Sequence, residues 1–131
     1  MILVDSSVWI DYFNGNQTSQ TDWLDSALGN TPIVIGDLIL TEVLQGFQSG
    51  KDFKTAKDIL LGIPFVPMEG QILALASAIN YRFLRRKGVT VRKTIDIIIG
   101  TCCIHNKLTL LHCDRDFDSM VKLLGLEIID I

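Results

Sequence analysis

Short apolar runs recur along the chain, separated by polar or turn-forming segments. Five of them have the length of β-strands, at residues 2–4, 33–35, 65–67, 108–111 and 127–131. The run at 108–111 is of the kind that is buried on both faces of a parallel sheet. Together these runs predict the strands of a small sheet.

Between the runs, apolar residues repeat every three or four positions, which is the spacing of an amphipathic helix. The repeats predict helices over about residues 8–13, 22–28, 37–47, 51–61, 69–87, 95–105 and 117–124. We expect Ser6 or Ser7 to cap the first helix and Thr94 to cap the sixth. Gly88 is expected to end the helix before it. The helix at 95–105 is apolar on nearly all sides, which favours a central position.

Two helices carry distinct apolar stripes, which we expect to face the core. The stripe at 51–61 consists of Phe53, Ala56, Ile59 and Leu60. The stripe at 69–87 consists of Ile72, Leu75, Ala76, Ile79 and Phe83. Short apolar strands alternating with helices predict a three-layer α/β/α fold with a central parallel sheet. At 131 residues, 48% of them apolar and without a repeat or linker, the chain is expected to form a single domain over 1–131.

Composition also bounds the class of protein. No basic segment precedes an apolar run at the start, so we expect no signal peptide. The apolar stretch at 95–104 is interrupted by Asp96 and is too short to span a bilayer, so no membrane is expected as a partner. The three cysteines, Cys102, Cys103 and Cys113, lack the spacing of a zinc site and are expected to be core residues of a cytoplasmic protein.

The net charge of −3 argues against a nucleic-acid partner, but the basic residues are unevenly distributed. Six of the twelve fall close together in the sequence: Arg82, Arg85, Arg86, Lys87, Arg92 and Lys93. A basic patch beside an acidic pocket would suit an enzyme that acts on a polyanion through bound cations. The alternative is a solvated helix end.

Five acids follow predicted strands or begin predicted helices. Asp5 ends the first strand, Asp114 and Asp116 follow the strand at 108–111, Asp96 lies in the first turn of the apolar helix, and Glu42 lies on a helix after the second strand. Parallel sheets place their sites beyond the carboxyl ends of the strands. These segments could therefore direct carboxylates to one edge of the sheet.

Each acid also has a structural interpretation. Asp5 could be a helix cap, Asp96 could complement a helix dipole, and Glu42 could lie on a solvated face. Asp114 and Asp116 could be ordinary turn residues. Asp96, however, is surrounded in sequence by isoleucines, and an unpaired buried charge is costly, which favours a ligand role.

Clustered carboxylates repel one another, and a cation makes such a cluster stable at neutral pH. Oxygen ligands without a histidine or cysteine set favour Mg²⁺ or Mn²⁺ over zinc. These ions activate water and neutralise charge on phosphate, so the pattern fits phosphoryl chemistry on a nucleic acid.

The same segments resemble the PIN-domain family, in particular the VapC-type toxins of toxin–antitoxin pairs. The matching pieces are MILVDSSVWIDYF, TEVLQG, TVRKTIDIIIGTCCI and LTLLHCDRDFD, in this order along essentially the whole chain. This resemblance implies a Mg²⁺-dependent ribonuclease that cleaves single-stranded or loop RNA and is inhibited by a VapB-like antitoxin.

The resemblance also implies roles for the acids. Asp5 and Asp96 would be the principal metal ligands, Glu42 would complete the site through water, and Asp114 or Asp116 would supply the fourth acid. One position departs from the family pattern, because many relatives have a threonine two residues before the late acid where this chain has His112. That departure leaves open whether a hydroxyl positions the substrate.

The loop that leads into Asp96 is expected to flank the metal pocket and contact RNA phosphates. It carries Arg92 and Lys93, and Arg86 on the preceding helix is a further candidate substrate contact.

Two other classes of protein remain open. A phosphatase or phosphotransfer domain of the same fold class also carries an aspartate after its first strand, although DSSVW lacks the second aspartate of a dehalogenase-type motif. A non-catalytic interaction module is the other alternative. Abundant aromatic residues favour partner surfaces, and we expect a homodimer. These residues are Trp9, Tyr12, Phe13, Phe47, Phe53 and Phe65.

Overall fold

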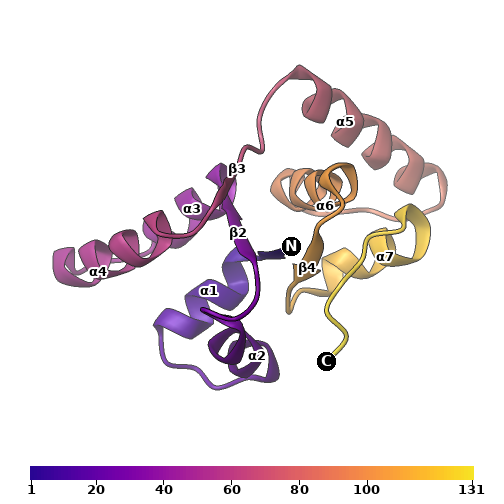
Figure 1. Ribbon diagram of the computed structural model, residues 1–131. Coiled ribbons are helices and arrows are strands. Elements are labelled where there is room, and N and C mark those ends of the chain that lie inside the picture. Colours follow the sequence, from indigo (N-terminus) through magenta and orange to yellow (C-terminus); the bar gives the residue numbers. More distant parts are fainter.

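A parallel sheet of four short strands runs through the middle of the molecule, as the computed structural model of residues 1–131 shows (Figure 1). Its order is β3-β2-β1-β4, with every neighbouring pair parallel. The strands are β1 (Ile2–Val4), β2 (Ile33–Gly36), β3 (Phe65–Val66) and β4 (Thr109–Leu111). This architecture confirms the predicted α/β/α class and four of the five predicted strands.

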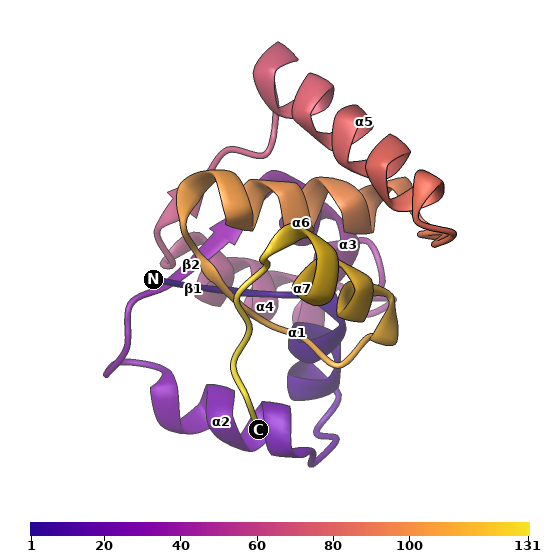
Figure 2. The same cartoon turned by 90° about the vertical axis from the view of Figure 1, so that its right-hand side faces the viewer.

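Seven helices form the two outer layers. Figures 1 and 2 show the first four on one face of the sheet and the last three on the other. Their bounds are α1 (Ser6–Phe13), α2 (Ser19–Ala27), α3 (Asp37–Leu44), α4 (Gly50–Leu61), α5 (Gln71–Arg86), α6 (Thr94–Asn106) and α7 (Asp118–Leu124). A 3₁₀ turn, Arg115–Phe117, links β4 to α7. None of the helices has the length and apolar composition needed to cross a bilayer.

The core lies on both sides of β1 and β4. Leu3 and Leu110 are completely buried, as are Trp9 on α1 and Phe117 in the 3₁₀ turn. Helix α6 lies between the sheet and α5, which explains why it is apolar on nearly all sides, as predicted. Its two cysteines are buried as expected. Cys113, in contrast, is exposed in the turn after β4, so its assignment to the core was wrong.

The predicted caps were wrong by one or two residues. Asp5, rather than Ser6 or Ser7, caps α1, because its carboxylate accepts the backbone N–H of Ser7, and this confirms the interpretation of Asp5 as a helix cap. Helix α6 begins at Thr94 itself, after Lys93, without a side-chain cap. At the C-terminus the predicted strand 127–131 was also wrong. Only a single parallel bridge, between Leu110 and Ile128, extends the sheet there.

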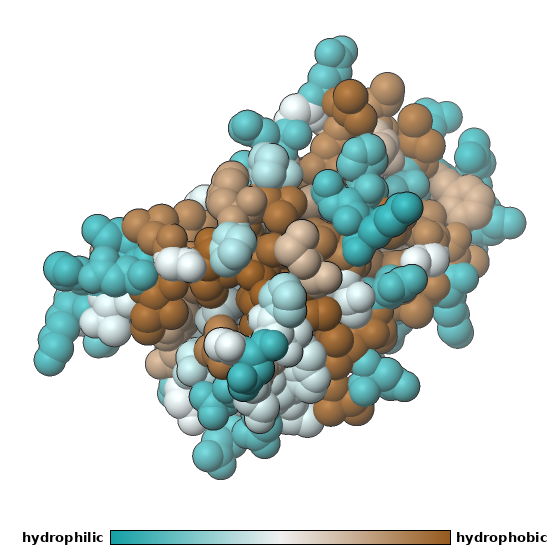
Figure 3. Space-filling model, viewed as in Figure 1, coloured by the Kyte–Doolittle hydropathy of each residue, from teal (hydrophilic) through white to brown (hydrophobic).

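The two predicted apolar stripes were only partly buried. On α4, Ala56 and Leu60 are buried while Phe53 and Ile59 are exposed. On α5, the side chains facing the core are Leu73, Ser77 and Leu84. Three members of the predicted stripe instead face outward, with Ile72 74%, Leu75 62% and Ile79 55% exposed, while Ala76 and Phe83 are half-buried. Helix α5 packs on α6 rather than on the sheet, so only a narrow face is covered, and Figure 3 shows apolar surface in this region.

Candidate metal centre

The adjacent strands β1 and β4 end at the same edge of the sheet, and acids follow both ends. Val4 pairs with Leu111, and the backbone N–H of Asp5 donates to the Leu111 carbonyl at 2.9 Å. This bond fixes Asp5 beside the turn that carries Asp114. The first turn of α6 brings Asp96 to the same edge.

Three carboxylates form a tight cluster at this edge. One oxygen each of Asp96, Asp114 and Asp116 lies within 4.8 Å of the other two. Asp96 is only 5% exposed, while Asp114 and Asp116 are half-buried. A single cation could contact all three residues at this spacing, which is the arrangement expected for oxygen ligands of Mg²⁺ or Mn²⁺.

Two buried carboxylate oxygens at the site have no hydrogen-bond partner. They are Oδ1 of Asp5 and Oδ2 of Asp96. The other oxygen of Asp5 accepts the Ser7 hydroxyl at 2.6 Å and the Ser7 backbone N–H at 3.3 Å. Unsatisfied buried acceptors are uncommon and costly. A bound cation is a suitable partner for such oxygens, so these residues fit a metal.

Burial and mutual repulsion perturb the acids. Burial raises the pKa of Asp5 despite the hydrogen bonds from Ser7. Burial also raises the pKa of Asp96 to about 6, with Lys93 opposing the rise and the charges of Asp5, Asp114 and Asp116 adding to it. The charges of Asp5, Asp114 and Asp116 therefore all act on Asp96, although Asp5 lies outside the tight cluster.

Glu42 approaches the site from α3 but does not join the tight cluster. Its Oε1 accepts a hydrogen bond from the Ser6 hydroxyl at 3.0 Å, and Ser6 is the residue next to Asp5. A bond between residues 36 positions apart ties α3 to the start of α1. Glu42 is thus placed on the Asp5 side of the site, where a contact through water is possible.

The two basic residues before α6 lie against the acids, as the position of their loop predicts. The Arg92 guanidinium binds both carboxylate oxygens of Asp116 at 3.2 to 3.3 Å. Lys93 Nζ lies 3.7 Å from Oδ2 of Asp114. Both basic side chains remain largely exposed, at 74% and 60%. Arg92 and Lys93 therefore form a basic rim that solvent and ligands can reach.

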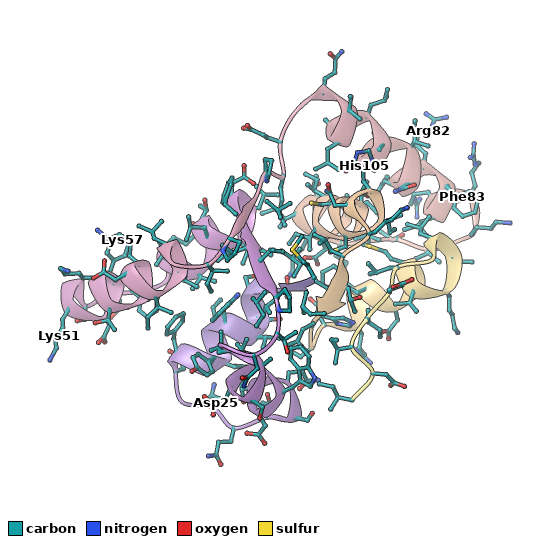
Figure 4. All side chains as sticks on the ribbon, viewed as in Figure 1. Asp25, Lys51, Lys57, Arg82, Phe83 and His105 are labelled. Carbon is teal, nitrogen blue, oxygen red and sulfur yellow. The ribbon has the colours of Figure 1, made fainter.

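Arg86 is not part of this rim. It is exposed in the last turn of α5 and makes no hydrogen bond or ion pair with the acids. Figure 4 shows Arg82 of the same helix on the outer side of the molecule. The basic residues between Arg82 and Lys93 are thus divided between the rim and a solvated helix end.

Ser6, Ser7 and His112 contact the acids but were not singled out as part of the site by the sequence pattern. The serines follow Asp5 directly, and a hydroxyl beside a buried acid is a signal that could have been used. The Nδ1 atom of His112 accepts the backbone N–H of Asp114 at 3.1 Å, a contact that only the folded turn reveals.

The fold thus places a candidate cation site, lined by oxygen atoms, at the carboxyl edge of the parallel sheet. Residues 2–123 match the PIN domain. The chain belongs to the PIN-domain family.

Known proteins resemble the chain over nearly its full length. It is 29% identical over 129 residues to the VapC ribonuclease Mb1587 of Mycobacterium bovis, covering 97% of this chain and 96% of that protein. A chain in the crystal structure of VapBC2 from Rickettsia felis, bound to a DNA fragment from their promoter, superposes with a TM-score of 0.78 at 17% identity, covering 100% of this chain and 99% of that chain. A toxin–antitoxin complex from Klebsiella pneumoniae gives a TM-score of 0.70 at 17% identity, covering 99% and 97%. These two structures share the fold.

Proposed function

We propose that this chain is a metal-dependent endoribonuclease that hydrolyses RNA phosphodiester bonds and is the toxin of a toxin–antitoxin pair. The observation that carries the proposal is the tight cluster of Asp96, Asp114 and Asp116. The buried, unpartnered oxygens of Asp5 and Asp96 add to it. Membership of the PIN-domain family and the similarity to a VapC ribonuclease support the same activity.

The acids have separate roles in this proposal. Asp5, Asp96 and Asp114 hold Mg²⁺ or Mn²⁺, and Glu42, oriented by Ser6, completes the site through water. Asp116, whose oxygens also bind Arg92, belongs to the tight cluster with Asp96 and Asp114 and links it to the basic rim. When bound, such a cation lowers the pKa of water and offsets charge on the phosphate as the leaving oxygen departs.

The basic rim holds the substrate. Arg92 and Lys93 are exposed beside the acids, which suits contacts to the phosphates that flank the scissile bond. Arg86, exposed in the last turn of α5, makes no contact with the acids and would contact only a longer RNA. A phosphatase acting on a small phosphate ester would need neither a solvent-facing rim nor an open edge, so the rim favours a polymer as substrate.

Protein partners follow from the surface and from the relatives. An antitoxin similar to VapB is expected to inhibit the enzyme, since solved relatives are VapBC and toxin–antitoxin complexes. A homodimer is expected through α5, whose outward stripe of Ile72, Leu75 and Ile79 exposes contiguous apolar side chains. Because it would hydrolyse RNA, the enzyme is expected to act in the cytoplasm.

Cleavage of a labelled single-stranded RNA by the purified chain tests the activity. We expect cleavage with Mg²⁺ or Mn²⁺, none with EDTA, and a loss of at least about a hundredfold in Asp96→Asn, because metal catalysis contributes several kcal/mol. Asp58→Asn is the matched control, since it makes the same chemical change on exposed α4. Cleavage that resists EDTA, or that survives in Asp96→Asn, would refute the proposal.

A further inference from the structure

In the turn between β4 and the 3₁₀ turn, His112 contacts the backbone of Asp114, a member of the acidic cluster. His112 is the first residue after β4, and Asp114 lies two residues later. The imidazole is half-buried. It is the only imidazole that contacts the turn, since His105 is exposed at the end of α6.

Two successive hydrogen bonds fix the shape of this turn. The backbone N–H of Asp114 donates to Nδ1 of His112 at 3.1 Å. The backbone N–H of Asp116 then donates to Oδ1 of Asp114 at 2.9 Å. The first bond orients the Asp114 backbone, and the second fixes the Asp114 carboxylate relative to Asp116. A side chain outside the cluster is thus hydrogen-bonded to the turn that carries two of its three acids.

The first bond also specifies the tautomer of the imidazole. A nitrogen that accepts an N–H has a free lone pair, so Nδ1 carries no proton and Nε2 carries it. The ring itself is held by packing, because its centroid lies 4.9 Å from that of Phe117, which is completely buried. The acceptor is therefore supported by the rigid core.

We propose that His112 is a positioning residue of the metal centre, which acts through Nδ1 to hold the turn so that Asp114 and Asp116 face Asp96. The inference rests on the proposed function, because it assigns a role to a residue of that same site. His112 touches neither metal nor RNA in this proposal. A hydrogen-bond acceptor at the Nδ1 position is what the site requires, rather than an imidazole as such.

Loss of the acceptor should raise the dissociation constant for the metal by a larger factor than it lowers kcat. Partners that orient a ligand typically contribute about 10–100-fold to metal affinity. In His112→Leu we therefore expect the dissociation constant for Mn²⁺ to rise by about that factor, since the Asp114 N–H loses its partner. At saturating Mn²⁺ the cation itself draws the acids together, so kcat should fall by no more than a few-fold.

Two variants separate the acceptor from the packing of the ring. His112→Asn places its Oδ1 where Nδ1 lies, so it keeps the acceptor but loses most of the ring. His112→Leu keeps an apolar side chain beside Phe117 but has no acceptor. Mn²⁺ binding is measured on the full chain by calorimetry, and hydrogen exchange of the Asp114 amide is measured by NMR in EDTA.

The expected result is near-wild-type Mn²⁺ affinity and amide protection in His112→Asn, with both lost in His112→Leu. If His112→Leu bound Mn²⁺ as tightly as wild type, or if the two variants were equally impaired, the acceptor role would be refuted. The amide measurement on wild type alone also tests the bond, because rapid exchange at Asp114 would contradict it. Failure of wild type to bind Mn²⁺ would instead overturn the proposed function, and with it this inference.

Discussion

Replacing Asp96 by asparagine should stabilise the metal-free protein while abolishing its response to metal. In the folded chain, burial and the neighbouring acids raise the pKa of Asp96 from 3.8 to about 6. A raised pKa means that the folded state favours the protonated form, so this group's contribution to stability is present below pH 3.8 and is lost as the pH rises through about 6. The rise corresponds to roughly 3 kcal/mol.

The magnitude predicts a definite pattern in urea unfolding with EDTA. At pH 7.5, Asp96→Asn should be more stable than wild type by up to roughly 3 kcal/mol, and this advantage should shrink toward zero near pH 4. Mg²⁺ at 100 times its dissociation constant should stabilise wild type by about 2.7 kcal/mol and the variant by much less. The control Asp58→Asn should gain no stability over wild type in EDTA, and Mg²⁺ should stabilise it as much as it stabilises wild type. An Asp96→Asn protein that is less stable than wild type at pH 7.5, with a difference independent of pH, would refute this reasoning.

Two further predictions concern the surfaces. Replacing Arg92 and Lys93 together by glutamine should weaken RNA binding for all sequences and flatten the dependence of log K on log salt by up to about 1.4, at ~0.7 per single-strand phosphate contact; an unchanged slope would contradict the contact. As a control, the same change at Lys51 and Lys57, which lie on α4 in Figure 4, should leave the slope unaltered. Leu75→Glu should convert a dimer to a monomer in analytical ultracentrifugation, because it places a charge in the exposed stripe of α5. A wild type that is already monomeric would exclude α5 as a dimer interface.

The fold and the placement of the acids could be predicted because both depend on local patterns. An apolar run followed by a carboxylate, as at Asp5 and Asp114, is positioned by strand direction alone. Asp96 could be predicted to be desolvated from its isoleucine neighbours, and its side chain is indeed buried. These patterns can be interpreted without knowing which other segments of the chain pack against them.

Other features depend on which surfaces meet, and the sequence does not encode that locally. The periodicity of α5 identifies an apolar stripe, but Ile72 and Leu75 are exposed because α6 separates α5 from the sheet. The bond from Ser6 to Glu42 joins two helices far apart in sequence. The contact of His112 with the Asp114 backbone arises only when the turn is folded. Such features require the tertiary structure.

Anomalous scattering from crystals grown with Mn²⁺ would test the central claim, that these acids form a cation site, most directly. The account predicts a strong peak at the cluster of Asp96, Asp114 and Asp116, with carboxylate oxygens of Asp96 and Asp114 at about 2.1 Å. The peak should be absent in Asp96→Asn crystals grown in the same way. A map with no peak at this edge of the sheet, or with manganese bound only at exposed acids such as Asp22 and Asp25, would contradict the account.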